Sequence, residues 1–452
     1  MALNKLILTL IILIIFISIY NIIPLDGNVS RGLAILFLIA SLWISELMPV
    51  TITALLVPVI AVISGVFDVK AAFSNFAHPI IFLFLGGFAL ATALHKQKID
   101  ELIADFILVL SRNNFLTAVL FLFTITALLS MWISNTATTV MMLPIALGLI
   151  YRTDKTEDAR SIVFILLGTA YSANIGGIGT LVGSPPNAIT AANLGMNFRD
   201  WLYIGLPSVA VLFPIMILTI YVIQKPDFKQ KIRISRNITM DFKEFLTNET
   251  LAVFVIFMIT VLLWLFSNPI SKLLGIDDNF DSLIAMGSLI SLVAFRTVTW
   301  KEVEKFTDWG VLLLFGGGLT LSSVLSETGA SKYMADTVNN LLAGYGIFIL
   351  ILGAATLIVL LTEFASNTAS AAILVPIFFA IGQDNPSISS NVLPLVIGIG
   401  ASCAFMLPVA TPPNALVYGT GMIKQSSMIL CGSILNLLSI VIISAIAYLF
   451  FN

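Results

Sequence analysis

The chain is poor in charged residues, cysteine and histidine. Only 10% of its 452 residues are Asp, Glu, Lys or Arg, whereas 59% are hydrophobic. An ordinary soluble domain has roughly 25% charged residues, so this chain has too few to cover its apolar surface in water. We therefore predict an all-α polytopic membrane protein. Two cysteines and two histidines argue against a disulfide framework or a metal cluster.

Motifs of soluble enzymes are also missing. Nothing in the sequence resembles a phosphate-binding loop, a nucleophile elbow or a cluster of metal ligands. This absence argues against an ATP-driven pump. We expect no enzymatic activity, no organic cofactor and no nucleic-acid partner.

Nine apolar runs have the length of an ordinary membrane span. The first run has one basic residue before it and no small-residue cleavage site after it, so we expect a retained helix rather than a signal peptide. The nine predicted helices cover residues 6–24, 32–48, 50–67, 79–95, 202–223, 250–267, 281–296, 309–326 and 428–450.

Four further apolar segments are too long for a single straight span. Residues 113–151, 161–198 and 385–423 contain no charged residue, and residues 345–383 contain only Glu363. At about 1.5 Å per residue, each would form a helix of roughly 60 Å, about twice the thickness of the hydrocarbon core. Each segment must therefore fold back or break.

The break points carry two polar sequence motifs, which we call the polar device, and each motif occurs twice. Ser134-Asn135-Thr136 recurs as Ser366-Asn367-Thr368, and Ser184-Pro185-Pro186-Asn187 recurs as Thr411-Pro412-Pro413-Asn414. Proline removes a backbone donor, and Ser, Thr and Asn compete for backbone hydrogen bonds, so helices are interrupted there. Unpaired backbone at this depth is tolerated only where it lines a cavity or packs against protein. The device predicts a ligand-binding cavity of a transporter.

Charge placement favours one topology. We take the N-terminus as cytoplasmic, 113–151 and 345–383 as re-entrant hairpins, and 161–198 and 385–423 as broken crossings. Eleven crossings follow, and the C-terminus lies outside. This topology places 17 of the 22 basic residues inside, as the positive-inside rule requires.

The duplication divides the chain. Phe84-Leu85-Gly86-Gly87 matches Leu314-Phe315-Gly316-Gly317, and in the predicted topology these two helices run in opposite directions. We therefore predict two inverted repeats, with glycines that allow close helix packing. The predicted parts are an extra N-terminal helix (1–30), a first repeat (31–224), a cytoplasmic linker (225–249) and a second repeat (250–452).

The repeated device suits an anion together with a small cation. Helix N-termini offer free N–H groups, helix C-termini offer free carbonyls, and Asn135 and Asn367 supply both a donor and an acceptor. No Lys or Arg lies in the four segments, so bound Na⁺ would help to offset a dianion. Glu46 and Glu363 are the acidic residues that look most embedded, and we favour structural roles for both. The position of Glu363 is occupied by Met131 in the first repeat.

Four motifs together resemble a known family. Residues 130–138, 183–187, 363–370 and 408–414 closely resemble the divalent anion/sodium symporter (DASS, or INDY) family, most of all its bacterial sodium-coupled dicarboxylate transporters. The resemblance implies eleven transmembrane helices, two re-entrant hairpins, two discontinuous helices and a homodimer. It also implies alternating access by an elevator mechanism, in a bacterial inner membrane.

The resemblance also implies binding residues. One Na⁺ site would use Ser130, Ser134, Asn135 and Gly183, and the other Thr362, Ala365, Asn367 and Ala410. The substrate would contact Asn135, Thr136, Ser184, Asn367, Thr368 and Pro412. The expected function is Na⁺-coupled import of C4-dicarboxylates such as succinate, fumarate and malate. Na⁺-independent dicarboxylate exchange stays open, and an anion channel is disfavoured because the polar residues cluster at breaks and do not follow whole helix faces.

Overall fold

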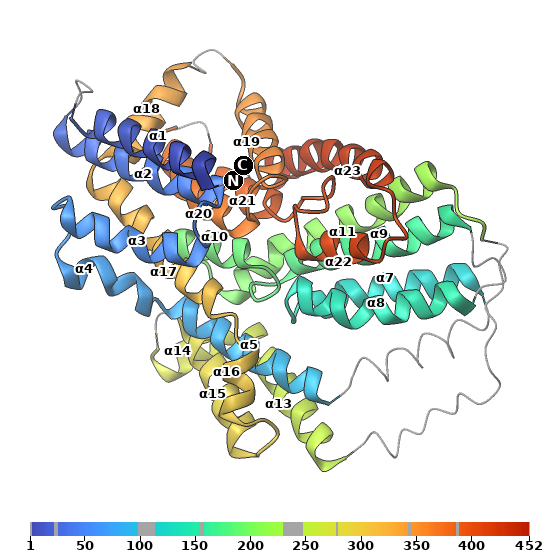
Figure 1. Ribbon diagram of the computed structural model, residues 1–452. Coiled ribbons are helices and arrows are strands. Elements are labelled where there is room, and N and C mark those ends of the chain that lie inside the picture. Colours follow the sequence, from blue (N-terminus) through green and yellow to red (C-terminus); the bar gives the residue numbers. More distant parts are fainter. Residues whose placement is uncertain are drawn as a thin grey trace.

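The computed structural model describes residues 2–21, 26–97, 114–152, 158–228, 247–276, 279–341, 345–385 and 388–451 (Figure 1). Within these ranges the regular elements are helices. Most of the predicted linker, residues 229–246, lies outside the described residues.

The first half of the chain forms α1 (Ala2–Asn21), α2 (Gly27–Ser45), α3 (Val50–Ile63), α4 (Val69–Ser74), η1 (Asn75–Ala77), α5 (Pro79–Lys96), α7 (Phe115–Ser130), α8 (Asn135–Arg152), α9 (Ala159–Gly176), η2 (Gly177–Gly179), α10 (Pro185–Leu194) and α11 (Phe198–Gln224). The second half forms α13 (Asn248–Leu265), α14 (Ser267–Leu274), α15 (Phe280–Ala294), α16 (Trp300–Phe306), α17 (Trp309–Glu327), α18 (Ala330–Leu341), α19 (Ile347–Leu361), α20 (Asn367–Gln383), α21 (Val392–Gly400), α22 (Pro412–Gly419), α23 (Gln425–Ile446) and η3 (Ala447–Phe451).

The predicted spans are helices in the structure. Seven helical stretches in the described part of the chain are long and apolar enough to cross a membrane, and further apolar helices are shorter. Each of the nine predicted spans overlaps one of α1, α2, α3, α5, α11, α13, α15, α17 and α23. The short helices α4, α14, α16 and α18 were not predicted, because each is too short or too polar to resemble a span.

The four long segments break where the polar device predicts. α7 ends at Ser130 and α8 begins at Asn135, and Figure 1 shows the two helices side by side. α19 ends at Leu361 and α20 begins at Asn367. A non-helical stretch also separates η2 from α10, and another separates α21 from α22.

Two pairs of helices cross closely through glycine. A Cβ atom on Gly86 of α5 would lie 2.5 Å from the carbonyl oxygen of Ala285 in α15, and one on Gly317 of α17 would lie 2.6 Å from that of Ala54 in α3. Both the glycines and the alanines are 231 residues apart, so the two crossings are equivalent. We name α3, α5, α15 and α17 the glycine-crossing group. The glycines serve helix packing, as predicted.

The packing shifts the sequence match by one residue. The motif pairs Gly86 with Gly316, whereas the crossings pair it with Gly317, and Gly316 faces the Phe76 ring instead. The same 231-residue offset relates Phe84 to Phe315, and the two rings touch each other at a centroid distance of 4.8 Å. The two phenylalanines therefore hold corresponding positions in the repeated sequence and contact each other in the fold.

The broken helices form a second group, α7–α11 with α19–α23. Within this broken-helix group, α22 packs on α8 and α9, and α10 packs on α20 and α21. In the pair α7–α8, the second helix, α8, is therefore covered by α22 from the second half of the chain. In the pair α19–α20, the second helix, α20, is covered by α10 from the first half. The two groups meet where α10 and α20 pack on α17.

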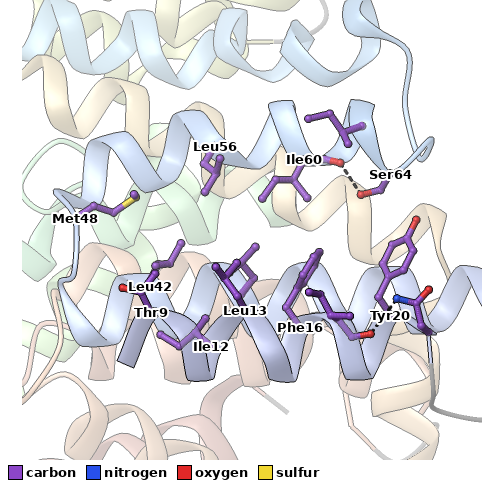
Figure 2. Close-up of a pocket in the computed structure, with 14 residues that line it drawn as sticks. Thr9, Ile12, Leu13, Phe16, Tyr20, Leu42, Met48, Leu56, Ile60 and Ser64 are labelled. Atoms are coloured by element: carbon purple, nitrogen blue, oxygen red, sulfur yellow. Dashed lines mark hydrogen bonds between the residues drawn. The ribbon is translucent and has the colours of Figure 1, made fainter. Parts of the chain in front are cut away.

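An apolar cavity of about 450 Å³ lies beside α1. In Figure 2, Leu13 and Phe16 of α1 face Leu56 and Ile60 of α3 across it. Its lining is almost wholly hydrocarbon. Glu46 ends α2 with a positive φ of 49° and is exposed, so it is a turn residue and not a buried carboxylate.

Candidate substrate and cation site

Four helices begin at the repeated polar elements. α8 starts at Asn135 and α20 at Asn367, while Ser184 and Thr411 are the N-cap residues of α10 and α22. The prolines occupy the first turn, where a missing N–H costs no intrahelical bond. Each helix therefore presents the positive end of its dipole at its start. The free N–H groups belong to α8 and α20, because α10 and α22 begin with two prolines, and the N–H groups of Asn187 and Asn414 donate to the Ser184 carbonyl oxygen and to Thr411 Oγ1. Such N-termini bind carboxylates without a basic side chain.

Oxygen atoms gather at the start of α8. Ser130 Oγ lies 2.7 Å from Asn135 Oδ1 and 2.7 Å from the carbonyl oxygen of Ala173. A hydroxyl has one proton and can donate to only one of them. Asn135 Oδ1 also lies 3.1 Å from the Ala173 oxygen and 3.3 Å from that of Gly183. We name these four residues the first oxygen cluster.

Two glycines allow the first oxygen cluster to form. A Cβ atom on Gly177 would lie 2.3 Å from Asn135 Oδ1. A Cβ atom on Gly183 would lie 2.5 Å from the carbonyl oxygen of Gly177 and 2.9 Å from that of Ser130. Any side chain at either position would push the oxygens apart, so both positions require glycine for close approach.

A second oxygen cluster forms before α20. Thr362 Oγ1 lies 2.6 Å from Asn367 Oδ1 and 3.0 Å from the carbonyl oxygen of Ala401. Here too one hydroxyl proton faces two acceptors. Thr362, Asn367 and Ala401 follow Ser130, Asn135 and Ala173 by 232, 232 and 228 residues. The second oxygen cluster consists of these three residues and repeats the first.

Each oxygen cluster has more acceptor oxygens than hydroxyl protons, and such a set of oxygens suits a small hard cation. In the first cluster the Asn135 amide oxygen faces acceptors only, and turning the amide would let its nitrogen donate to all three. A cation among the oxygens would favour the amide as it stands, whereas without a cation the turned amide satisfies both its oxygen and its nitrogen, whose present neighbours are donors only. Carbonyl, amide and hydroxyl oxygens at unwound helices are the ligands that Na⁺ uses in membrane proteins.

An asparagine tethers each proline loop. Asn187 Nδ2 donates to the carbonyl oxygens of Gly177 and Thr180 at 2.8 and 2.7 Å. Asn414 Nδ2 donates to those of Ala404 and Leu407, both at 3.1 Å. The three positions correspond at a single offset of 227 residues. The last residue of each Pro-Pro-Asn element thus holds the unwound segment that precedes it.

The two proline loops are joined to each other. Asn174 Nδ2 donates to Thr411 Oγ1 at 3.1 Å, and Ser184 Oγ lies 3.3 Å from Ser402 Oγ. Asn174 and Ser402 hold equivalent positions, so each broken helix contacts the loop of the other. Because Ser184 follows Gly183 and Ser402 follows Ala401, a short chain of contacts connects the two oxygen clusters.

The remaining predicted site residues lie around this centre. Ser134 Oγ accepts from the N–H of Ala137 in the first turn of α8, so it caps that helix. Thr136 and Pro412 are exposed in the first turns of α8 and α22, whereas Thr368 is buried in that of α20. Ala365 and Ala410 are buried in the two loops beside the second oxygen cluster.

Sequence reasoning missed several of these contacts. The carbonyl groups of Ala173 and Ala401 belong to residues with no polar side chain, so nothing in the sequence marks them. Asn174 and Ser402 make corresponding contacts with the proline loops, but they are different residue types. A search for repeated motifs in the sequence therefore does not find them. Gly177 was one glycine among 29, and only its distance to Asn135 singles it out.

Glu363 is fully buried at the same break. Its carboxylate accepts from the backbone N–H groups of Phe405, Met406 and Leu407 at 2.7, 2.8 and 2.9 Å, and from Asn436 Nδ2 at 2.6 Å. Four donors satisfy the charge without a basic residue. The predicted structural role agrees with these contacts.

A polar cavity of about 290 Å³ lies between the two helix groups. Ser322 of α17 lies on one side and Asn193 of α10 on the other, and Ser322 Oγ donates to Asn193 Oδ1 at 2.8 Å. Asn75, His78, Ser323, Ser326, Ser331 and Gln383 supply further polar lining. The contact between the groups is therefore polar and incompletely filled at this point.

Solved transporters share the fold at low sequence identity. The YdaH transporter of Alcanivorax borkumensis matches 84% of this chain and 86% of its own, with a TM-score of 0.61 and 14% identity. MtrF of Neisseria gonorrhoeae, described as one of a class of antimetabolite efflux pumps, matches 95% of this chain and 96% of its own, with a TM-score of 0.52 and 13% identity. These likenesses concern the fold alone.

Sequence relatives are also transporters. An uncharacterised transporter of Haemophilus influenzae is 51% identical over 97% of this chain and 95% of its own length. A sodium-dependent dicarboxylate transporter, SdcS, of Staphylococcus saprophyticus is 33% identical over 92% of this chain and 85% of its own. The sequence profile of the citrate transporters matches residues 40–400. The predicted family resemblance is thereby confirmed: the chain belongs to the citrate transporter family and is related over most of its length to sodium-dependent dicarboxylate transporters.

Proposed function

We propose that this protein imports C4-dicarboxylates such as succinate, fumarate and malate, driven by the Na⁺ gradient. The observation that carries the proposal is the pair of equivalent oxygen clusters, each at the start of a helix and each joined to a proline loop. The two clusters would hold Na⁺, and the N-termini of α8, α10, α20 and α22 would hold the carboxylates.

Electrostatics explains why the cation and the anion would bind together. No Lys or Arg occurs in the four segments that contain the site. A dianion there meets only neutral donors and helix dipoles, so each bound Na⁺ lowers the cost of its charge. The names of the SdcS relatives, which describe sodium-dependent dicarboxylate transport, favour the same coupling.

The proposed mechanism is an elevator. The broken-helix group would carry the substrate, and the glycine-crossing group would stay fixed in a homodimer. The two equivalent glycine crossings make the fixed group rigid, and the polar cavity at Ser322 and Asn193 favours a surface that can slide. In this proposal the helix pairs α7–α8 and α19–α20 are re-entrant, and two inverted repeats give eleven crossings. The N-terminus is cytoplasmic in the inner membrane of a bacterium.

Uptake into proteoliposomes tests the proposal. Labelled succinate should accumulate above its external concentration when Na⁺ is imposed outside, and K⁺ in place of Na⁺ should abolish accumulation. Uptake that ignores Na⁺ but requires dicarboxylate inside the vesicles would replace symport by exchange. Equilibration that never accumulates or exchanges substrate would point to a channel.

A further inference from the structure

The two proline loops are held in place by different chemistry. In the second, the Glu363 carboxylate accepts three consecutive backbone N–H groups, from Phe405 to Leu407. In the first, the equivalent residue is Met131, whose side chain carries no charge and only a weak acceptor, the thioether sulfur. There the Thr180 hydroxyl donates to the carbonyl oxygen of Met131, and residues 177–179 form the turn η2.

Glu363 is connected to the second oxygen cluster from both sides. Thr362, its neighbour in the chain, contacts Asn367 and the carbonyl oxygen of Ala401. Leu407 donates to Glu363 Oε2, and the carbonyl oxygen of Leu407 accepts from the N–H of Ala410 at 3.2 Å and from Asn414. Thr362 and Glu363 therefore hold both ends of the unwound segment 401–407.

The negative charge of this carboxylate is offset by dipoles alone in its own surroundings. Residues 345–383 and 385–423 contain no Lys or Arg, and the donors to Glu363 are three amide groups of the backbone and one amide side chain. In a site of low dielectric constant, a negative charge on the residue that follows Thr362 raises the affinity of the second oxygen cluster for a cation. The first oxygen cluster lacks an equivalent charge, because Met131 takes its place.

We propose that Glu363 is a positioning residue for Na⁺ at the second oxygen cluster, and that it makes the two Na⁺ sites unequal. Its carboxylate fixes the backbone at 405–407, and its charge favours the cation. The inference rests on the proposed function, in which both clusters bind Na⁺. A glutamine is a poor substitute, because its amide nitrogen would face backbone N–H groups.

Three variants test the role of the charge. Glu363→Gln removes it, Glu363→Asp keeps it on a shorter side chain, and Met131→Leu changes the equivalent residue without changing charge. The readouts are the rise in melting temperature with increasing Na⁺, without substrate, and the Na⁺ dependence of succinate uptake. For Glu363→Gln we expect the half-saturating Na⁺ concentration to rise about tenfold or more. A loss of affinity of about tenfold corresponds to the free energy of one hydrogen bond to a charged group. Glu363→Asp should recover part of that loss, and Met131→Leu should stay within about twofold of the wild type.

The outcomes separate this inference from the proposed function. A wild type whose melting temperature and uptake ignore Na⁺ would refute Na⁺ coupling itself. A Na⁺-dependent wild type with a Glu363→Gln variant of unchanged Na⁺ dependence would refute only the role of Glu363. If Glu363→Gln does not fold, the Asn436→Leu variant tests the inference instead. It removes one hydrogen-bond donor to Glu363 and leaves the carboxylate in place. With one donor fewer the carboxylate charge is less offset, so a fall of about threefold in half-saturating Na⁺ supports the inference, and no change or a rise overturns it.

Discussion

At the scale of single residues, the candidate site consists of close approaches between oxygen atoms. Ser130 and Thr362 each bring one hydroxyl proton to two acceptors, an amide oxygen and a backbone carbonyl. The geometry depends on residues that contribute no polar atom of their own. Gly177 and Gly183 allow the backbone to come within reach of Asn135 and Ser130.

Replacing Gly177 by alanine should weaken Na⁺ binding at the first oxygen cluster. The new methyl group would lie 2.3 Å from Asn135 Oδ1, so the amide must move away from its partners. We expect half-saturating Na⁺ for succinate uptake to rise about tenfold or more, because ligand sites tolerate displacements of only about 0.5 Å. The matched control is Gly148→Ala in α8, where nothing lies within 4 Å of the added atom. Equal Na⁺ dependence in the two variants would exclude the cluster as a cation site.

The residues of the site differ in how far they could be predicted from sequence. Asn135 and Asn367 stand out because identical tripeptides recur in segments too long for one span. The carbonyls of Ala173 and Ala401 could not be found in this way, because every residue has a carbonyl and only the folded chain decides which ones converge. Asn174 and Ser402 form equivalent contacts with different side chains, so a search for sequence repeats passes over them.

At the scale of helices, equivalent elements from the two halves of the chain pack on each other. The α5–α15 and α3–α17 crossings use glycine against alanine, and α10 and α22 cover α20 and α8. The predicted spans agree with the helices because long apolar runs have few alternatives in a membrane. The short helices α14 and α18 were not predictable as spans, since only one face of each is apolar and their positions depend on the neighbouring helices.

The two glycine crossings should contribute similarly to stability. Gly86→Ala and Gly317→Ala each place a methyl group within 2.6 Å of a backbone carbonyl oxygen that cannot move without its helix. We expect each variant to lose roughly 1–3 kcal/mol of stability, as overpacked cores do. The check is the melting temperature in detergent, with Gly353→Ala in α19, which meets nothing within 4 Å, as the control. Melting temperatures equal to that of the control would show that these crossings are not close-packed.

At the scale of the whole molecule, the two helix groups divide the work of transport in the proposed mechanism. The glycine-crossing group is held together by backbone contacts, whereas the broken-helix group is held together by hydrogen bonds between loops. The surface between them contains the polar cavity near Ser322 and Asn193. An elevator mechanism requires the two groups to slide along this surface while the packing inside each group stays unchanged.

A cross-link between the groups should stop transport. Ser322 Oγ lies 2.8 Å from Asn193 Oδ1, so a short bis-methanethiosulfonate reagent should cross-link Ser322→Cys with Asn193→Cys. The native Cys403 and Cys431 are buried and should not compete. Cross-linking should reduce succinate uptake to background, and a reducing agent that releases the reagent should restore it. Continued transport by the fully cross-linked protein would show that these helices do not slide past each other.

The most direct measurement of the central claim is succinate binding as a function of Na⁺ concentration in the wild type, Asn135→Ala and Asn367→Ala. If both oxygen clusters bind Na⁺ together with one dicarboxylate, the wild type should give a sigmoidal curve with a Hill coefficient above about 1 and up to about 2. Each variant should lose the sigmoidal shape and need far more Na⁺, because each lacks the amide of one cluster. Wild-type binding that is independent of Na⁺, or variants that match the wild type, would contradict the account.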